Sequence, residues 1–400
     1  MLTAAMAAGL ASEGADVVDL GVLPTPGVAF ASGVHGAASA VISASHNPFA
    51  DNGIKLFGPD GRKLDDRAER SIEAELALLA DGDTGSSAGN PRPQGHGVGR
   101  VSSEPDLANG YENHLSRLLG DRRLDGLRVV VDCANGAASL IAPRVLRELG
   151  ADVTAIHAEP DGSNINARCG STYPQSLQAA VRAQGADAGL ALDGDADRVL
   201  AVDASGGLID GDHLIAMCAI DLHERGGLRN DTVVVTVMTN LGFRIGMVER
   251  GIHVVETAVG DRAVLAAMQS GGHSLGGEQS GHVIFGDVAT TGDGVLTGLS
   301  LLDLLCRSGR PLAELATEAM TRLPQVLTNV EVGHIHADVA DRISTEIAAA
   351  AGELGDQGRV LVRPSGTEPL VRVMVEASTA AQAHAVADVL VEAVKRVCAT

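Results

Sequence analysis

The sequence contains 400 residues, of which 45% are hydrophobic, and its formal net charge at pH 7 is −21. This composition is typical of a globular protein, and the length predicts roughly two to four domains. The negative charge excludes nucleic acid as an expected partner, because no basic stripe offsets repulsion from the phosphates. The five cysteines are scattered without a CxxC pair, which argues against a structural zinc cluster or a disulfide scaffold and predicts reduced thiols.

The N-terminal part of the chain shows no pattern of secretion or membrane insertion. The first Lys or Arg is Lys55, so no basic segment introduces a signal peptide. Residues 21–45 carry no Lys, Arg, Asp or Glu, but Pro24 and Pro26 interrupt them. We interpret this stretch as buried strand and loop. We expect a soluble, cytoplasmic protein that contacts no membrane.

One local pattern occurs three times, around Gly14, Gly150 and Gly251. A helix-like run ends in Glu and Gly, and β-branched residues follow. Gly adopts the left-handed conformation that ends helices, and the Val/Ile run predicts a strand. Apolar strands that begin near Leu127 and Thr232 precede the second and third copies, which therefore predict βαβ units in parallel sheets. We expect three related α/β domains.

The other segments predict a linker and a smaller C-terminal domain. Residues 81–105 are rich in Gly, Ser and Pro, which predicts an exposed loop followed by a linker. After Pro324 the pattern changes to that of a small α+β domain. Its predicted elements are helices over 343–354 and 380–397 and strands over 358–366 and 370–378. The predicted domain limits are 1–98, 99–203, 204–322 and 323–400.

The first motif, SASHNPFADNGIK, runs from Ser43 to Lys55. It places Ser45 and His46 on a loop after the strand-like SAVIS. The segment is either a polar turn whose Asn and Asp side chains cap their own backbone, or a functional loop held by a strand. The motif alone does not decide between the two.

The second motif, DGDADR, follows the apolar run AGLAL and holds Asp193, Asp195 and Asp197. Alternating carboxylates in a tight turn can converge on one Mg²⁺ ion, which prefers a few carboxylates with water or phosphate. An EF-hand is excluded because its sixth and twelfth positions are Arg198 and Ala204 instead of Gly and Glu. A haloacid-dehalogenase phosphatase normally carries its Asp motif near the N-terminus. A solvated acidic turn is disfavoured, because the three charges repel one another without a cation.

Two further motifs suit a sugar and a phosphate. GEQSGH, residues 277–282, offers a carboxylate, an amide, a hydroxyl and an imidazole to a polyhydroxylated ligand, although His282 also fits a structural histidine. RPSGTEPLVR, residues 363–372, combines a Gly-containing turn, two hydroxyls and two arginines, which is typical of phosphate binding. A hairpin turn with incidental arginines is the alternative.

In this order along the chain, the four motifs resemble the α-D-phosphohexomutase superfamily, and the resemblance covers essentially the whole sequence. ISASHNP, residues 162–172, GEQSGH and RPSGTEPLVRVMVE are most similar to the phosphoglucosamine mutase family within it. Members that act on glucose or mannose tend to differ at Gln279 and to carry SN in place of SG after Pro364. The resemblance implies an α/β fold of three related mixed-sheet domains and a small C-terminal α+β domain, arranged around a central cleft.

The resemblance also implies the activity. It is that of an isomerase that interconverts glucosamine 6-phosphate and glucosamine 1-phosphate through glucosamine 1,6-bisphosphate, for UDP-N-acetylglucosamine synthesis. Ser45 would become a phosphoserine, primed by the bisphosphate or by a kinase. One Mg²⁺ per subunit would be held by Ser45, Asp193, Asp195 and Asp197. His46 and Lys55 are the candidates for handling the hydroxyl proton, although a lysine is a base only if its pKa is lowered.

The remaining predicted roles are carried over residue by residue. The substrate-binding candidates are Arg198, Glu278, Ser280 and His282 for the sugar, and Arg363, Ser365, Gly366, Thr367 and Arg372 for the phosphate. The four domains, in order, would carry the phosphoserine loop, the metal, the sugar-binding loop and the phosphate-binding turn. The expected partner is a small amino-sugar phosphate, and related bacterial enzymes indicate a homodimer.

The sequence departs from the family at its start. Family members begin with an FGT-DGxRG segment and a strand leading to a GRD(T/P)R motif, and neither precedes Met1 here. We expect the chain as written to be less stable and much less active than one with that segment. The alternatives are a phosphoglucomutase or phosphomannomutase, an inactive sugar-phosphate-binding remnant, and a phosphatase that releases phosphate steadily.

Overall fold

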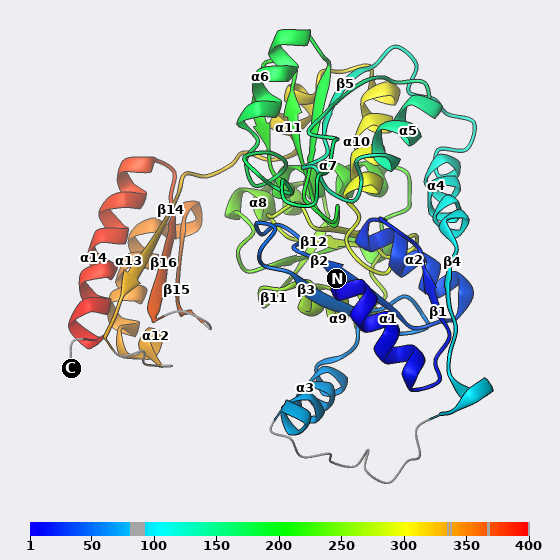
Figure 1. The fold of residues 1–400 in the computed structure, drawn as a ribbon. Coiled ribbons are helices and arrows are strands. Elements are labelled where there is room, and N and C mark those ends of the chain that lie inside the picture. The colour runs from blue at the N-terminus through cyan, green and yellow to red at the C-terminus, as the bar shows by residue number, and fades with distance from the viewer. Residues whose placement is uncertain (81–92, 334–335, 337, 366–368, 399–400) are drawn as a thin grey trace. The chain divides into compact units, whose positions relative to one another are not determined.

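Figure 1 shows the computed structural model, in which residues 1–80, 93–333, 336, 338–365 and 369–398 are described. The chain forms two compact units. The first comprises Met1–Val237 and Val255–Ala316, and the second comprises Met238–Val254 and Thr317–Thr400. No helix in the described ranges is both long and apolar enough to cross a membrane.

The first part of the larger unit contains two small sheets. Strands β1 and β4 pair in parallel, whereas β2 and β3 form an antiparallel hairpin in which Ser43 lies opposite Gly53. The elements are α1 (Leu2–Ser12), β1 (Val17–Asp19), α2 (Thr25–His35), β2 (Ser39–Ser43), β3 (Gly53–Phe57), α3 (Asp66–Ala80), β4 (Val101–Ser103) and α4 (Ala108–Arg117).

Two sequence predictions are partly wrong in this part. Residues 21–45, expected as strand and loop, do contain the strand β2, but Thr25–His35 form helix α2. Pro26 is compatible with this helix because it lies in the first turn, where its missing N–H breaks no helical hydrogen bond. Residues 81–105, expected as loop and linker, include β4, which pairs with β1 through the backbone. Its three exposed residues carry no alternating apolar pattern, so nothing in residues 101–103 predicts a strand. Residues 81–92 of that prediction lie outside the described part of the chain.

A five-stranded mixed sheet follows, in the order β6-β5-β7-β8-β9. Strand β5 runs parallel to β6 and β7, and β8 is antiparallel to both β7 and β9. Residues 129–131 of β5 are buried as a continuous apolar run, as expected for a strand covered on both faces. The elements are β5 (Arg128–Asp132), α5 (Ile141–Glu148), β6 (Asp152–Ile156), α6 (Gln175–Gln184), β7 (Ala188–Leu192), β8 (Val199–Asp203) and β9 (Leu208–Ile209).

The next sheet has four strands in the order β11-β10-β12-β13. Strand β12 runs parallel to β10 and antiparallel to β13, so the segment between β12 and β13 is a hairpin turn. The elements are α7 (Gly211–Glu224), β10 (Thr232–Thr236), α8 (Leu241–Glu249), β11 (His253–Thr257), α9 (Asp261–Gly271), β12 (Leu275–Gly277), β13 (Val283–Phe285), α10 (Gly294–Ser308) and α11 (Leu312–Ala319).

The three predicted helix–glycine–strand units are confirmed. Gly14, Gly150 and Gly251 have φ angles of 92°, 103° and 74°. Each follows its helix (α1, α5 or α8) and precedes its strand (β1, β6 or β11). Only glycine adopts these angles without a steric cost, so the residue type determines where each helix ends.

The C-terminal region is an antiparallel sheet in the order β14-β16-β15, with α13 and α14 contributing to its apolar core. The two predicted strands and two predicted helices are present, but β14 was not expected, because its sequence QVLTNVE is largely polar. It pairs with β16 over its whole length. The elements are β14 (Gln325–Glu331), α12 (Val339–Arg342), α13 (Ser344–Leu354), β15 (Arg359–Pro364), β16 (Leu370–Glu376) and α14 (Ala380–Cys398). The predicted fold class is confirmed, whereas the arrangement of the domains around a cleft stays a prediction.

Candidate active site

The loop between β2 and β3, residues 44–52, presents Ser45 in a constrained conformation. Ser45 has φ 52°, a left-handed angle that is uncommon for a residue with a side chain. Its backbone N–H donates to Ser43 Oγ at 2.9 Å, which stabilises the turn. Ser45 Oγ lies 3.4 Å from Nδ1 of His46. The hydroxyl therefore stands beside an imidazole, on a loop whose strain is typical of functional sites.

This Ser45 loop is held by a segment more than a hundred residues further along the chain. The Asn166 side-chain amide donates to the carbonyl oxygens of Ser45 at 2.7 Å and Asn47 at 2.8 Å. A Cβ atom on Gly194 would lie 2.5 Å from the Ser45 carbonyl oxygen, so only glycine permits this approach. The Ser45 loop is thus placed against the turn that follows β7.

That turn, residues 193–198, is the aspartate loop. Asp193, Asp195 and Asp197 are 0%, 1% and 3% exposed, and one carboxylate oxygen from each lies within 4.8 Å of the others. In each of them one buried oxygen, Asp193 Oδ2, Asp195 Oδ1 or Asp197 Oδ1, has no hydrogen-bond partner among the described residues. Buried carboxylate oxygens without partners are costly, so this donor set fits a hard cation such as Mg²⁺.

Two residues from the first part of the chain contact the buried carboxylates of the aspartate loop. Lys55 Nζ lies 2.5 Å from Asp195 Oδ2 and 2.9 Å from Asp197 Oδ2, and the Thr25 hydroxyl donates to Asp195 Oδ2 at 2.6 Å. Burial alone lowers the pKa of Lys55, but the charges of Asp197 and Asp195 outweigh it and raise the pKa above its ordinary value. Lys55 is thus a counter-ion of the aspartates in these contacts, and its role in handling the hydroxyl proton stays a prediction.

The neighbouring groups have pKa values shifted in opposite directions. Burial and the charges of the other two aspartates raise the pKa of Asp193. Burial also acts to raise the pKa of Asp197, but the neighbouring His282 imidazole and the positive charges of Lys55 and Arg198 lower it overall. Burial lowers the pKa of His46, and the positive charge of Arg198 acts in the same direction. His46 is therefore neutral near pH 7 and able to accept a proton.

The predicted sugar-binding loop forms the turn between β12 and β13 and packs on the aspartate loop. A Cβ atom on Gly281 would lie 2.1 Å from the Val199 carbonyl oxygen, and that glycine accepts the Val199 N–H at 3.1 Å. Glu278 Oε1 accepts the Gly260 N–H at 3.0 Å, and the Ser280 side chain is exposed. The backbone of this turn therefore lies beside Val199, directly after the aspartate loop, while contact of the Glu278 and Ser280 side chains with a sugar stays a prediction.

His282 and Arg198 lie directly beside the carboxylates. His282 is buried; its Nε2 accepts the Gly292 N–H at 3.1 Å, and its Nδ1 lies 3.7 Å from Asp197 Oδ2. Arg198 Nε lies 3.8 Å from Asp197 Oδ1. The imidazole thus orients Asp197, and a direct contact of His282 with substrate stays a prediction.

The predicted phosphate-binding turn joins β15 and β16 in the smaller unit. Arg363 and Arg372 occupy directly opposite positions of the two strands. Like charges at such positions repel each other, and burial together with the Arg372 charge lowers the pKa of Arg363. Ser365 is buried, and its hydroxyl has no hydrogen-bond partner among the described residues. This arrangement suits an anion, and the predicted contacts Gly366 and Thr367 lie outside the described residues.

Sequence reasoning missed Thr25, Asn166 and Gly194 as parts of the site. Asn166 lies within the segment 162–172 that carries the family resemblance, which was the only signal for it. Thr25 and Gly194 act through contacts between segments distant in sequence, and no local pattern predicts such contacts.

Comparison with known proteins agrees with this fold. The chain matches the four models of the phosphoglucomutase/phosphomannomutase family: alpha/beta/alpha domain I over residues 1–80, domain II over 109–206, domain III over 210–323 and the C-terminal domain over 322–393. The chain therefore belongs to the phosphoglucomutase/phosphomannomutase family.

Curated relatives narrow the resemblance within the family. The chain is 57% identical over 396 residues to the phosphoglucosamine mutase of Frankia casuarinae, covering 98% of this chain and 85% of the relative. It is 55% identical over 396 residues to that of Thermobifida fusca, covering 98% and 86%. The predicted similarity to phosphoglucosamine mutases is confirmed, and the alternatives from other sugar classes are not favoured.

Solved structures share the fold. A phosphoglucomutase/phosphomannomutase family protein of Burkholderia thailandensis superposes with a TM-score of 0.79 at 26% identity, covering 99% of this chain and 86% of that one. N-acetylphosphoglucosamine mutase of Aspergillus fumigatus, solved with GlcNAc-6P and magnesium, gives a TM-score of 0.71 at 20% identity, covering 99% of both chains. At that identity the second likeness supports the fold alone.

Proposed function

We propose that this chain is an isomerase that interconverts glucosamine 6-phosphate and glucosamine 1-phosphate through a phosphoserine at Ser45. Its curated relatives are phosphoglucosamine mutases. The observation that carries the proposal is the contact of the Ser45 loop with Gly194 and Asn166, beside three buried aspartates. A serine held in this position next to a cation site is suited to carry and transfer a phosphoryl group.

The aspartate loop is the proposed Mg²⁺ site, with Asp193, Asp195, Asp197 and the phosphorylated Ser45 as ligands. When bound, the ion neutralises charge on the phosphoryl oxygens, so that the transfer requires mainly positioning and electrostatics. Thr25 and Lys55, both from the first part of the chain, hold the Asp195 carboxylate in place. Lys55 also supplies a positive charge where an anionic phosphate must approach.

The proton steps involve His46. When a sugar hydroxyl attacks the phosphoserine, a new O–P bond forms at the sugar and the O–P bond to Ser45 Oγ breaks. The hydroxyl proton must reach the oxygen of the leaving serine, and the neutral imidazole, 3.4 Å from that oxygen, can accept and return it. The bisphosphate then turns over and returns its other phosphate to Ser45, which restores the starting enzyme.

Substrate binding is proposed for two sets of residues. Arg198, Glu278, Ser280 and His282 would hold the sugar, supported by the packing of Gly281 on Val199. Arg363, Ser365, Gly366, Thr367 and Arg372 would bind the phosphate that is not reacting, supported by the opposed arginines and the buried Ser365 hydroxyl. We also retain the four domain limits, 1–98, 99–203, 204–322 and 323–400, as a proposal that the family matches support.

³¹P NMR tests the function directly. The purified chain is mixed with Mg²⁺, a trace of glucosamine 1,6-bisphosphate and glucosamine 6-phosphate. We expect a glucosamine 1-phosphate signal that grows to an equilibrium plateau without free phosphate. Ser45→Ala should abolish it, whereas Ser102→Ala, at an exposed serine of β4, should not. Steady release of inorganic phosphate would indicate a phosphatase instead, and conversion by Ser45→Ala would contradict the phosphoserine mechanism.

A further inference from the structure

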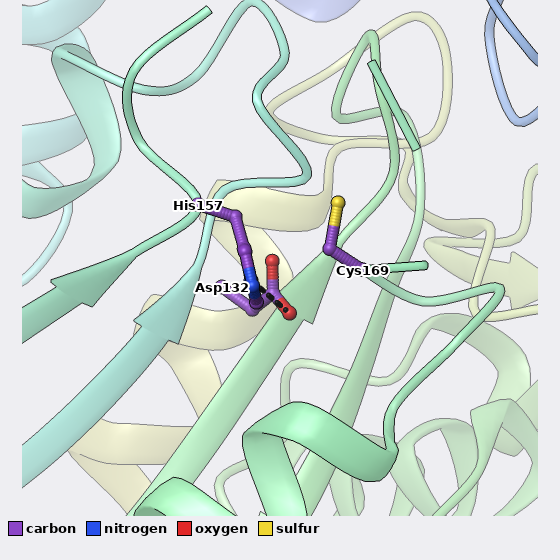
Figure 2. A group of neighbouring side chains, drawn as sticks. All are labelled: Asp132, His157 and Cys169. Atoms are coloured by element: carbon purple, nitrogen blue, oxygen red, sulfur yellow. Dashed lines mark ion pairs between the residues drawn. The ribbon is translucent and has the colours of Figure 1, made fainter. Parts of the chain in front are cut away.

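A second group of potential metal ligands lies at the same five-stranded sheet, outside the site described above. Figure 2 shows Asp132, His157 and Cys169, which come from three separate segments. Asp132 is the last residue of β5, His157 directly follows β6, and Cys169 lies on the segment before α6. One ligand atom from each lies within 4.8 Å of the other two. We call these residues the mixed-donor cluster.

The Nδ1 atom of His157 is placed so that it can bind a metal ion. His157 Nδ1 lies 3.0 Å from Asp132 Oδ2. This buried nitrogen nevertheless makes no hydrogen bond to any described residue, so its donor direction does not point at the carboxylate. The contact is an ion pair only when the imidazole is protonated, and the same two atoms are close enough together to be two ligands of one ion.

The surroundings hold the cluster in place and leave one approach to it. Asp132 and Cys169 are fully buried, whereas the His157 side chain is 32% exposed. The Ala134 N–H donates to Asp132 Oδ1 at 3.0 Å, and the Ser176 hydroxyl lies 3.4 Å from Asp132 Oδ2. Such second contacts orient a ligating carboxylate. A small ion can therefore enter beside the imidazole and meet side chains that are already oriented.

We propose that Asp132, His157 and Cys169 bind one divalent transition-metal ion of the zinc class. A thiolate and an imidazole favour such ions over Mg²⁺, which prefers oxygen ligands. Ligands about 2.0–2.3 Å from a tetrahedral zinc ion lie roughly 3.3–3.8 Å apart, so no pair of ligand atoms needs to approach by more than about 1.5 Å. Water would complete the coordination. This site is separate from the aspartate loop and does not depend on the proposed function.

A nucleophilic Cys–His–Asp arrangement is the alternative use of these residues. A nucleophilic cysteine must be accessible and readily ionised. Cys169 is fully buried, and burial together with the Asp132 charge raises the pKa of its thiol to about 11. Metal binding does not need an exposed thiol, because the ion displaces the proton when it binds.

The position of the cluster gives the ion a structural consequence. Cys169 lies three residues after Asn166, whose amide holds the carbonyls of Ser45 and Asn47. An ion that joins Cys169 to the ends of β5 and β6 would fix this segment, and with it the support of the Ser45 loop. We therefore expect metal binding to raise the melting temperature of the whole chain.

Cobalt absorption tests the proposal, because Co²⁺ bound to a thiolate gives a charge-transfer band. The untagged full chain, treated with a chelator and a reductant, is titrated with Co²⁺ in excess Mg²⁺, which keeps the aspartate loop occupied. We expect a thiolate-to-cobalt band that saturates at one ion per chain and is displaced by Zn²⁺. Cys169→Ser should abolish the band, and His157→Gln should weaken Co²⁺ binding at least tenfold, as expected for the loss of one ligand.

Matched controls separate the cluster from other thiols and imidazoles. Cys306→Ser and His223→Gln change a partly buried thiol and a partly exposed imidazole elsewhere in the chain, and they should leave the band unchanged. Circular dichroism verifies that each variant is folded, and the partly exposed His157 provides a second variant if Cys169→Ser does not fold. Absence of a band, a band that persists in the folded Cys169→Ser variant, or full Co²⁺ affinity in His157→Gln would overturn the proposal.

Discussion

The aspartate loop and the mixed-donor cluster lie at strand ends of one five-stranded sheet, yet they offer different ligands. Asp193 directly follows β7, whereas Asp132 ends β5. Parallel neighbouring strands bring their carboxyl ends to the same edge of a sheet, which is where ligands bind in open α/β folds. The first site presents only carboxylates and the second presents oxygen, nitrogen and sulfur. The shared fold therefore supplies the location, and the residues at each strand end determine which ion fits.

The two sites also differ in how they are completed. The aspartate loop needs Lys55 and Thr25, which are 140 and 170 residues distant from Asp195. The mixed-donor cluster is formed by residues 132–169 alone, within one sheet and its loops. We therefore expect changes at the aspartate loop to affect catalysis and to leave the mixed-donor cluster intact.

Asp195→Asn should have the largest effect. It removes a ligand charge from the proposed Mg²⁺ site, and metal ions contribute several kcal/mol of transition-state stabilisation, so turnover should fall on the order of 10³-fold. The ³¹P assay measures this, and the cobalt band should persist. Asp152→Asn, at an exposed position of β6, is the matched control. Turnover within about tenfold of the unsubstituted chain would show that this carboxylate does not hold the metal.

Asn166→Ala should affect catalysis without affecting the metal ligands. The Ser45 and Asn47 carbonyls lose their shared donor, and a misplaced reacting group costs about 10²-fold in rate. We expect kcat to fall by that factor while KM and Mg²⁺ affinity stay nearly constant. Asn109→Ala, at an exposed asparagine of α4, should behave like the unsubstituted chain. A higher KM with unchanged kcat would assign Asn166 to substrate binding.

Asp293 is a buried carboxylate whose partner, the Tyr111 hydroxyl, is uncharged. It differs in this from Asp197, whose pKa is lowered by the positive charges of Lys55 and Arg198. Tyr111 Oη donates to Asp293 Oδ2 at 2.9 Å, and burial raises the pKa of Asp293 to about 6. The folded state thus binds this proton more tightly than the unfolded state, whose aspartate pKa is about 3.9. This contribution to stability is complete below about pH 4 and is lost as pH rises through about 6.

Asp293→Asn should remove that pH dependence. Between pH 4 and 7, the free energy of unfolding of the unsubstituted chain should fall by about 2 to 3 kcal/mol relative to the variant. Urea unfolding of both proteins at several pH values measures the difference. A constant difference across this range would mean that Asp293 titrates with an ordinary pKa.

Thr25→Val should have the smallest effect. The substitution removes the hydroxyl that donates to Asp195 and preserves the side-chain volume. Loss of a contact that orients a ligand typically weakens metal affinity 10–100-fold, and with Lys55 still in place we expect about tenfold. Calorimetric titration with Mg²⁺ measures this, with Thr154→Val on β6 as the control. Unchanged affinity would leave Thr25 a packing residue only.

Local sequence determined the features that depend on neighbouring residues. The three glycines that end helices, the buried strand before the aspartates and the turns of the first three motifs were all predictable, because each follows from backbone preferences or from the period of apolar residues. The family resemblance extended this to the class of enzyme. Helix α2, strand β4 and strand β14 were missed, because a proline in a first turn and short or polar strands carry no periodic signal.

Only the tertiary structure decided which distant residues meet. It placed Lys55 and Thr25 on Asp195, where the lysine is a counter-ion of the buried carboxylates. It also brought Asp132, His157 and Cys169 together, although 25 and 12 residues separate consecutive members of this group. Such contacts depend on strand order and on the positions of whole segments, and these are set by the burial of the entire sheet. No single stretch of sequence contains that information, which is why the distant partners of the aspartate loop and the whole mixed-donor cluster became visible only in the fold.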